Sequence, residues 1–484
     1  AQAILTAKAI NAGQTCVAPD TVWLIGHSIA DFIAAARATG IPNREALGIG
    51  TLMNARGLME LIIINIGLQK GIISEGLFAT LVVMAVITGH RVLILEREKF
   101  PRYHIGESLI PFTFDPLERL GLVERMKASH FQKKYSVMFV QPDGKRSQPF
   151  YFHTRYDINT VAQTWQVLRS EFDEMVLRHA AEKGAEVREE CTVTTLLRDA
   201  HNAVSGVRVK NADGSEEELT ARLTIDATGK EAFASNRLGW RLPDPKLNKV
   251  AVWTYYEGAS RESGIDEGTT TVAAIPEKGW FWHIPQHGDR ISVGVVAEGK
   301  YLSRDGVRDP KEMMDREIAG NPWMREHLAT GRQEGEYWIT SEYSRHSKYG
   351  AAPGLLLVGD AFAFLDPVFS SGVMLALKSG VLAADAVHEA LEADDVSPER
   401  FAGYAAAIRT SVENMRKLVY AFYDPNFSFK DLIMRFPEAS GAVTDCLSGD
   451  LGRDYTELWA QISEFVDLPD DLPYGAPLTE TVPA

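Results

Sequence analysis

A carboxylate, Glu96, directly follows the apolar run Val92 to Leu95. An acid at the end of a strand accepts hydrogen bonds from two hydroxyl groups, and can therefore bind the ribose of a nucleotide. In a dinucleotide-binding unit, a G-x-G-x-x-G loop precedes such an acid by about 20 residues. Gly48 and Gly50 have this spacing, but Met53 occupies the third position. We therefore predict a ribose-binding acid whose phosphate-binding loop is missing.

The segments that must position this acid alternate between strand and helix. Residues 165–187 have apolar side chains at i, i+3 and i+4, which predicts an amphipathic helix. Residues 223–229, LTIDATG, form an apolar strand pattern followed by a turn of small residues. A second buried-type strand ends in Gly359 and Asp360, and a loop and a long helix follow it. This alternation is typical of α/β proteins.

The helix over 165–187, the LTIDATG strand and the strand that ends in Gly359 and Asp360 follow Glu96 in this order along the chain. Together with Glu96, these segments resemble FAD-dependent enzymes of the aromatic hydroxylase type. The resemblance implies an α/β fold: an FAD-binding Rossmann-like domain, a mixed-sheet substrate domain and a helical C-terminal segment. We place the FAD-binding body at 89–400, the inserted substrate sheet at about 235–340, and the helical segment at 401–484.

The same resemblance implies cofactor contacts. Glu96 would bind the adenosine ribose, Arg169 would lie near the pyrophosphate, and Asp360 would hold the ribityl chain. A helix starting near Ser371 would direct its N-terminal amides at the flavin ring, and this positive end would stabilise the anionic reduced flavin. Three further residues are implied to contact the cofactor: Pro367, Gly372 and Val373.

Two further motifs narrow the chemistry. The string GWFWHIP, Gly279 to Pro285, resembles the G-W-x-W-x-I-P signature of flavin-dependent halogenases. The string DPVFSSGV, Asp366 to Val373, resembles the halide-site loop of the same family. The strings FPRYHIGESLIP and YDPNFSFKDLIMRFPE extend the resemblance over about 89–470.

This resemblance implies that reduced FAD, supplied by a separate flavin reductase, reacts with O2 to give a flavin hydroperoxide. Chloride or bromide is then oxidised to hypohalous acid, which reaches a lysine beside the aromatic substrate. Lys134 is our candidate, because strand alternation places it with Ser136 and opposite Tyr135 and Val137. Lys133 shares the aromatic face and is the weaker candidate. Apolar surroundings would lower the pKa of Lys134 and leave its amine free.

The remaining site residues follow from the same family. Trp280 and Trp282 would separate the flavin from the organic substrate, and Ser371 and Gly372 would bind the halide at a helix N-terminus. The substrate is expected to be a phenol or pyrrole, either free or tethered to a carrier protein. No metal ligand set is predicted.

The first 88 residues resemble other families. Residues 1–40 are similar to the nucleophile segment of aldehyde dehydrogenases, with Cys16 at the thiol position. Residues 41–88 are similar to transmembrane helices of cation/proton antiporters. Neither piece is long enough to carry its family's function. Gly67, Gly71 and Gly76 do not complete a G-x-G-x-x-G loop. We interpret residues 1–88 as an N-terminal segment made of pieces that resemble two other families, joined to a different protein.

Composition excludes several classes of function. A formal net charge of −15 argues against nucleic acid or an anionic membrane as partner. The three cysteines, Cys16, Cys191 and Cys446, are far apart, which favours a reducing, cytoplasmic setting. The apolar run from Gly76 to Thr88 is shorter than the about 20 residues of a membrane span, so membrane insertion is not expected.

Two alternatives stay open at this point. An FAD-dependent aromatic monooxygenase or a prenyl-type reductase shares the fold and similar Gly-Trp strings, and dependence on halide would separate it from a halogenase. An inactive chimera is the second alternative, because the dinucleotide loses a helix-terminus anion site when the glycine loop is missing.

Overall fold

The computed structural model describes residues 90–276, 279–341, 344–476 and 478. Contacts divide the chain into two units, and the larger unit, residues 93–182 with 186–484, carries every element described below. The segments 1–40 and 41–88, which we compared with aldehyde dehydrogenases and antiporters, lie outside the described residues.

The largest sheet has seven strands and is mixed. Its order is β16 (Arg332–Ser341), β12 (Val250–Glu257), β15 (Arg290–Ala297), β14 (Gly279–Pro285), β13 (Thr270–Ile275), β3 (Ser136–Val140) and β4 (Phe150–Tyr151). Only the β13–β3 pair of this sheet is parallel. The predicted substrate sheet is therefore joined by two strands, β3 and β4, from outside the 235–340 range.

Smaller sheets surround it, and most have short strands. A parallel pair consists of β1 (Leu93–Leu95) and β6 (Glu186–Arg188). The other sheets are β10 (Thr224–Asp226), β19 (Leu355–Leu357) and β18 (Ala351–Ala352); β11 (Arg241–Pro243), β17 (Arg345–Ser347) and β20 (Ala363–Phe364); β2 (Gln132–Lys134) and β5 (Thr164–Gln166); and β7 (Thr192–Arg198), β8 (Val204–Lys210) and β9 (Glu216–Thr220). The strand predicted over 223–229 is thus β10.

The α-helices of the described residues are α6 (Phe114–Arg119), α7 (Val123–Ala128), α8 (Arg169–Glu182), α9 (Phe233–Arg237), α10 (Gly299–Leu302), α11 (Pro310–Gly320), α12 (Pro322–Leu328), α13 (Gly372–Glu392), α14 (Ala402–Tyr423), α15 (Phe429–Arg435), α16 (Ala439–Ser448) and α17 (Thr456–Ile462). Short 3-10 turns are η1 (Pro111–Thr113), η2 (Phe152–Thr154), η3 (Gly229–Glu231), η4 (Gly264–Asp266), η6 (Arg304–Gly306), η7 (Gly359–Ala361), η8 (Pro367–Phe369) and η9 (Pro398–Phe401). The predicted amphipathic helix is α8, and the helix expected near Ser371 is α13.

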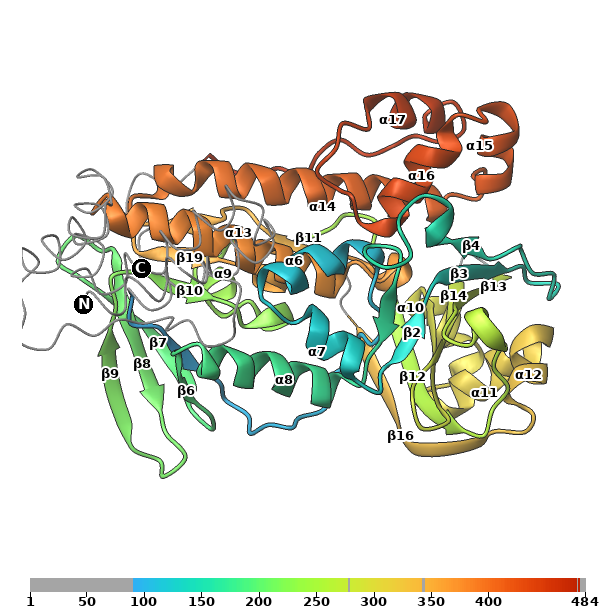
Figure 1. Cartoon of the computed structure of the whole chain (residues 1–484), viewed down its shortest axis with the longest axis horizontal. Helices are drawn as coiled ribbons and strands as arrows, with labels where there is room; N and C mark the ends of the chain where they lie inside the picture. The colour runs from blue at the N-terminus through green and yellow to red at the C-terminus, as the bar shows by residue number, and fades with distance from the viewer. Residues whose placement is uncertain (1–89, 277–278, 342–343, 477, 479–484) are drawn as a thin grey trace, which may run out of the picture. The chain divides into compact units, whose positions relative to one another are not determined.

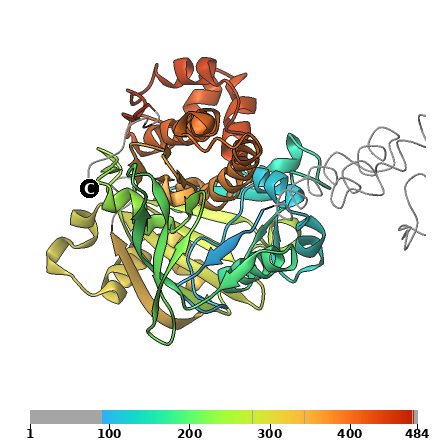
Figure 2. The same ribbon diagram turned by 90° about the vertical axis from the view of Figure 1, so that its left-hand side faces the viewer.

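The seven-stranded sheet separates two hydrophobic cores. In β14, Trp280, Trp282 and Ile284 face the larger core, to which α13 and α14 contribute. The intervening Phe281 faces the second core, under α11 and α12. Side chains of a strand point alternately to its two faces, so one sequence string serves both cores. Figure 1 shows α13 and α14 side by side, and Figure 2 shows the C-terminal helices as a layer on one side of the sheets.

No helix among the described residues is long and apolar enough to cross a membrane.

Candidate active site

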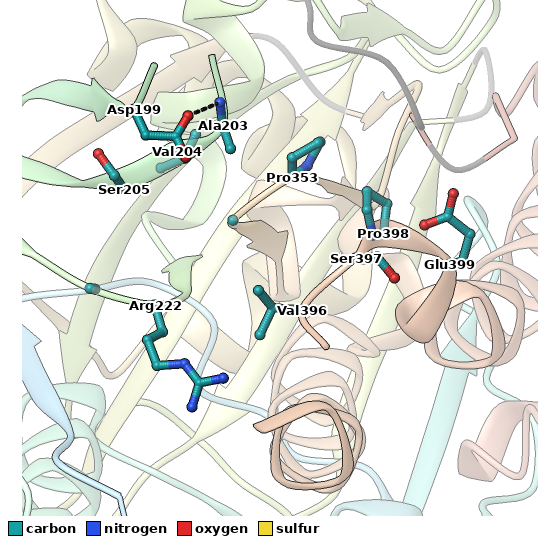
Figure 3. A pocket seen from close by; sticks show the side chains of 12 residues that line it. Asp199, Ala203, Val204, Ser205, Arg222, Pro353, Val396, Ser397, Pro398 and Glu399 are labelled. Carbon is teal, nitrogen blue, oxygen red and sulfur yellow. Dashed lines mark hydrogen bonds between the residues drawn. The ribbon is translucent and has the colours of Figure 1, made fainter. Parts of the chain in front are cut away.

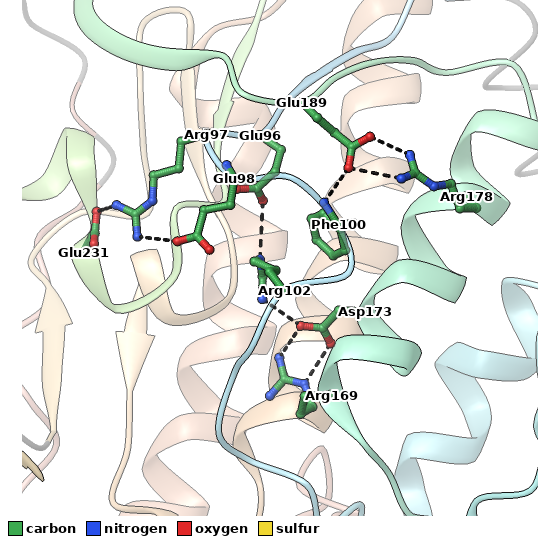
Figure 4. Close-up of polar contacts among 10 residues, drawn as sticks. All are labelled: Glu96, Arg97, Glu98, Phe100, Arg102, Arg169, Asp173, Arg178, Glu189 and Glu231. Atoms are coloured by element: carbon green, nitrogen blue, oxygen red, sulfur yellow. Dashed lines mark hydrogen bonds and ion pairs between the residues drawn. The ribbon is translucent and has the colours of Figure 1, made fainter. Parts of the chain in front are cut away.

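Glu96 lies directly after the parallel strand β1, where the sequence predicts it. One carboxylate oxygen accepts the backbone N–H of Glu98 at 2.9 Å, and the other lies 4.0 Å from Nε of Arg102. Arg102 pairs with Asp173 at 3.1 Å, and Asp173 pairs with Arg169 (Figure 4). A chain of alternating charges therefore joins Glu96 to Arg169, two residues predicted to bind FAD.

Arg169 is held at the start of α8 by several contacts. Its Nε and one terminal nitrogen donate to the two oxygens of Asp173 at 2.7 and 3.0 Å. The other terminal nitrogen donates to the carbonyls of Ile105 and Gly106 at 2.8 and 3.1 Å. Gly106 has a φ of +102°, and a Cβ at this residue would lie 3.0 Å from the guanidinium. The glycine therefore lets the FPRYHIGESLIP segment close around Arg169.

The DATG motif, residues 226–229, and the GD motif, residues 359–360, lie near the ends of two neighbouring parallel strands. The N–H of Val358, after β19, donates to the carbonyl of Asp226 at the end of β10, at 3.0 Å. The Asp226 carboxylate accepts hydrogen bonds from the backbone and hydroxyl of Thr228 and from the backbone of Ala234. Its role in this structure is to close the DATG turn.

Asp360 lies two residues beyond Val358 and is half-buried. Burial raises the pKa of its carboxyl to about 6, against the attraction of the nearby cations Arg169, Arg241 and Lys230. No donor to this carboxylate is found among the described side chains. A carboxylate at the ends of these strands is thus available to accept hydroxyl hydrogen bonds, as expected of a ribityl-binding residue.

Lys134 is buried, with 2% of its surface exposed. Its Nζ donates to the hydroxyl of Ser108 at 2.9 Å and to the carbonyl of Leu109 at 3.0 Å. Burial lowers the pKa of Lys134 to about 7, and no carboxylate opposes this shift. Lys134 and Ser136 are buried and Lys133 is exposed, so the predicted alternation is confirmed, although the strand is interrupted at Tyr135 between β2 and β3.

A buried polar chain connects the lysine to the tryptophan motif. Ser108, the lysine's partner, is next to Glu107, whose carboxylate accepts the hydroxyl of Tyr255 at 2.6 Å. Burial raises the pKa of Glu107, against the opposing effect of the Tyr255 and Ser292 hydroxyl groups. Ser292 in turn accepts the indole N–H of Trp282 at 3.0 Å. The second Glu107 oxygen is buried and has no hydrogen-bond partner among the described residues.

Trp280 and Trp282 are both buried, with ring centroids 6.0 Å apart. Trp282 packs against Gly294 of β15, where a Cβ would lie 2.2 Å from the indole ring. The indole N–H of Trp280 donates to the hydroxyl of Tyr423 at 2.7 Å. Tyr423 then donates to the carboxylate of Asp366 at 2.9 Å. Hydrogen bonds therefore connect Trp282 to Ser292 of β15, and Trp280 through Tyr423 to the loop that begins at Asp366.

The predicted halide loop ends at the first turn of α13. Ser371 is 1% exposed and precedes the helix, which begins at Gly372. Its hydroxyl makes no capping hydrogen bond, so it remains available to a ligand. A Cβ at Gly372 would meet nothing within 4 Å. Asp366 anchors the loop because its carboxylate also accepts the N–H of Val368 at 3.1 Å.

Burial raises the pKa of Asp366 to about 6, against the hydrogen bonds from Tyr423 and Val368. Pro367 opens η8 in this loop, and Val373 packs against the cluster of α6 to α8. The structure therefore places Ser371, Gly372, Pro367 and Val373 in one loop and helix start.

Sequence reasoning missed the residues that connect these parts: Ser108, Glu107, Asp366 and Tyr423. All four lie in strings that we compared with halogenases, which was the signal available. Nothing in the sequence indicates that Tyr423 reaches Trp280, because the two are 143 residues apart. Such long-range pairs depend on the packing of α14 against the sheet.

A separate hollow of about 460 Å³ lies between the β7–β8 region and the start of α14 (Figure 3). None of the predicted site residues lines it. Its acid Asp199 accepts the backbone N–H groups of His201 and Ala203 at 2.8 and 2.9 Å, and its Arg222 pairs with Asp394. Asp199 and Arg222 are already paired, and we assign the hollow no chemical role.

The described donors and acceptors fit FAD at the ribose and ribityl positions. Glu96 and Asp360 each follow a parallel strand, Arg169 attracts Asp360, and Arg102 and Asp173 connect Arg169 to Glu96. The start of α13 offers backbone N–H groups and a hydroxyl without a capping partner. This is the set of groups expected for a dinucleotide beside a helix N-terminus.

Comparison with known proteins identifies the family. The sequence model of a family described as tryptophan halogenase matches residues 71–166 and 143–428. The tryptophan 2-halogenase of Chondromyces crocatus is 32% identical over 343 residues, covering 70% of this chain and 64% of that protein, just under two thirds. A 1H-pyrrole-2-carbonyl-[peptidyl-carrier protein] brominase of Pseudoalteromonas luteoviolacea is 32% identical over 310 residues, covering 63% of this chain and 73% of that protein.

The match begins at Gly71, upstream of the boundary we predicted at residue 89. Gly71 and Gly76 have the spacing of the first and third glycines of G-x-G-x-x-G, and Ile73 stands in the second position. The prediction from sequence missed this partial motif because it required all three glycines of G-x-G-x-x-G. The complete loop is still absent from the sequence.

Solved structures agree with the sequence match. The flavin-dependent brominase Bmp2 has a TM-score of 0.70 at 27% identity, covering 81% of this chain and 94% of that one. The myxobacterial chondrochloren halogenase CndH has a TM-score of 0.66 at 31% identity, covering 80% and 92%. The predicted fold class is confirmed, and the chain belongs to the tryptophan halogenase family of FAD-dependent halogenases.

Proposed function

We propose that this chain halogenates an electron-rich aromatic ring of the phenol or pyrrole type, using chloride or bromide, O2 and reduced FAD. The substrate is either free or attached to a carrier protein, and a separate flavin reductase supplies the reduced FAD. Relatives named for halogenating pyrrole-2-carbonyl groups on peptidyl-carrier proteins support a tethered aromatic substrate.

The observation that carries the proposal is the surroundings of Lys134. Its amine is buried, contacts only neutral oxygens, and has a pKa lowered to about 7. A neutral amine has a lone pair, whereas an ammonium ion does not. The amine of Lys134 therefore captures or orients hypohalous acid next to the aromatic ring. A surface lysine would stay protonated and could not capture the halogen through a lone pair.

The other residues supply the halide and keep the organic substrate in place. The hydroxyl of Ser371 and the N–H groups at the start of α13 hold the anion, because a helix N-terminus favours negative charge. Trp280 and Trp282 form an apolar wall that keeps the aromatic substrate on the lysine side. The ring is then exposed to the diffusible oxidant and not to the cofactor.

Bound reduced FAD supplies the two electrons with which O2 oxidises the halide, giving hypohalous acid and water. Glu96 and Asp360 hold the cofactor's hydroxyl groups, and Arg169 supplies positive charge near Asp360. The aromatic carbon then takes the halogen from hypohalous acid, the ring loses a proton, and the released oxygen leaves as water.

The activity is tested with the purified full chain, FAD, NADH, a flavin reductase, and a panel of simple phenols and pyrroles. We expect a brominated product by mass spectrometry that requires bromide. A hydroxylated product formed without halide would identify a monooxygenase. A folded chain that binds FAD but yields no product from the panel, free or carrier-loaded, would contradict the proposal.

FAD binding is measured separately by quenching of flavin fluorescence. We expect saturable binding, and tighter binding by Ile73→Gly, because the second glycine lets the backbone approach the pyrophosphate. The matched control is Ile72→Gly, which adds a glycine outside the motif spacing. Absence of binding by both the parent chain and Ile73→Gly would favour an inactive chimera.

A further inference from the structure

Two histidines and a glutamate outside the halogenase site converge near the protein surface. His130 lies between α7 and β2, Glu171 lies in the first turn of α8, and His287 lies in the turn between β14 and β15. One ligand atom of each residue lies within 4.8 Å of those of the other two. Residues far apart in the sequence therefore present two imidazoles and a carboxylate to one point.

The spacing of these atoms suits a small transition-metal ion. Nε2 of His130 is 2.7 Å from one Glu171 oxygen, and Nε2 of His287 is 3.8 Å from the other. In a tetrahedral zinc site with bonds of about 2.0–2.1 Å, neighbouring ligand atoms lie about 3.3 Å apart. The observed separations lie on either side of that value, and one ligand atom of each residue lies within 4.8 Å of those of the other two.

The turn that carries His287 is well fixed. Residues 287–289 form a short hairpin loop closed by the hydrogen bond from the N–H of Gln286 to the carbonyl of Arg290 at 2.7 Å, and Gly288 and Asp289 both have positive φ, +67° and +61°. The side chain of Gln286 donates to the carbonyl of Val167 at 3.4 Å, which ties the hairpin to the segment before α8. The position of His287 is therefore set by the backbone.

His287 has no structural hydrogen bond that explains its orientation. Its side chain is 23% exposed, and its buried Nδ1 has no hydrogen-bond partner among the described residues. Its Nε2 faces the Glu171 carboxylate, and its ring lies edge-to-face against that of His130, with ring centroids 4.2 Å apart. An imidazole turned toward a carboxylate and a second imidazole is the arrangement that a metal site requires.

We propose that His130, Glu171 and His287 bind a divalent cation of the zinc class, with water completing the coordination. Imidazole nitrogen and carboxylate oxygen are ligands that zinc, nickel and cobalt accept. The ion would link the segment between α7 and β2, helix α8 and the β14–β15 hairpin. These elements carry Lys134, Arg169 and the two tryptophans, so the metal would stabilise the frame of the halogenase site without taking part in its chemistry.

The test uses the full chain, freed of metal with a chelator, and zinc measured against a chromophoric competitor. We expect His130→Ala, His287→Ala and Glu171→Gln each to weaken one zinc site at least about tenfold. His201→Ala, an exposed histidine in the β7–β8 turn, is the matched control and should leave the affinity unchanged. Cobalt should give a visible absorption band in the parent chain that is lost in His287→Ala.

Thermal unfolding gives a second readout, because an ion that binds only the folded state raises the melting temperature. We expect zinc to raise it in the parent chain and in His201→Ala, but not in the His130→Ala/His287→Ala double variant. Zinc affinity, cobalt absorption and thermal shift that are the same in the double variant as in the parent would overturn the proposal. In that case the three residues form a hydrogen-bonded surface cluster only.

Discussion

Lys134 and Arg416 are both buried cations, with 2% and 1% of their surfaces exposed, but their surroundings differ. Arg416, in α14, pairs with Glu413 at 2.9 Å and with Asp244 at 3.3 Å. Lys134 contacts one hydroxyl and one carbonyl. The arginine is neutralised by acids, whereas the lysine has none.

The difference shows up in the charge state of each group. The acids around Arg416 raise its pKa, so the charge is fixed and the cluster ties α14 to the Asp244 segment. Burial without an acid lowers the pKa of Lys134 to about 7. A buried charge with no partner is costly, and the group gives up its proton instead. The paired arginine keeps its charge, and the unpaired lysine has the surroundings that the proposed capture of hypohalous acid requires.

The largest effect is expected from Lys134→Met, which keeps the length of the side chain but removes the amine. Halogenation should fall by roughly 10²–10⁴-fold, the range typical when a positioned proton-transfer or capturing group is lost. The measurement is bromide-dependent product formation under single-turnover conditions. Lys133→Met is the control, because Lys133 is adjacent and exposed. Equal losses in both variants would remove the distinction between the two lysines.

In contrast to Lys134→Met, Arg416→Met should reduce the stability of the protein and leave the halogenation rate of the folded protein unchanged. Removing the cation leaves Glu413 and Asp244 buried and unneutralised, so the free energy of unfolding should fall by about 3–5 kcal/mol. Chemical denaturation measures this loss. The fraction that remains folded should halogenate at the parent rate. The contrast between the two cations would be wrong if Arg416→Met were as stable as the parent chain, or if the folded variant did not halogenate.

Sequence reasoning placed the local parts of the site well. Strand alternation predicted that Lys134 shares a face with Ser136 and that Lys133 lies on the other face, and the acid of a βαβ unit predicted Glu96 at a strand end. Both depend on a few neighbouring residues. The seven-stranded sheet was harder, because β3 and β4 join β13 from more than 100 residues away. Strand pairing of this kind leaves no local periodicity to detect.

The contacts between motifs could not be predicted at all. Asp366 looked like the first residue of a halide loop, but its carboxylate reaches Tyr423 at the far end of α14. In the sequence, Glu107 is only one residue of a string that we compared with halogenases. In the structure, its buried carboxylate accepts the hydroxyl of Tyr255 and lies near Ser292. Each contact requires two elements to pack at a set angle, which depends on the whole core.

Stability should depend on pH through Lys134 and not through Arg416. The pKa of Lys134 is lowered in the folded chain, so between pH 7 and about 10 the unfolded chain binds more protons and stability rises with pH. Lys134→Met removes this dependence. The difference in unfolding free energy between parent and variant should change by roughly 2 kcal/mol from pH 7 to pH 9. Arg416→Met should show no such dependence, because arginine stays protonated.

Denaturation curves at the two pH values measure this effect. A parent chain and a Lys134→Met variant that keep a constant difference over the window would mean that Lys134 has an ordinary pKa. The proposed neutral amine would then be wrong, whatever the loss of activity.

The smallest effects should distinguish two tyrosines of α14, each of which donates a hydrogen bond to an aspartate elsewhere in the fold. Tyr423 joins Trp280 to Asp366 at the halide loop, and Tyr420 donates to Asp244 in the Arg416 cluster. Tyr423→Phe and Tyr420→Phe should each lower the unfolding free energy by about 1 kcal/mol, the usual value for one hydrogen bond. Only Tyr423→Phe should also raise the KM for bromide several-fold, because it frees the loop that ends at Ser371. Halide titrations with both variants decide this: equal KM values would show that Tyr423, like Tyr420, only stabilises the fold.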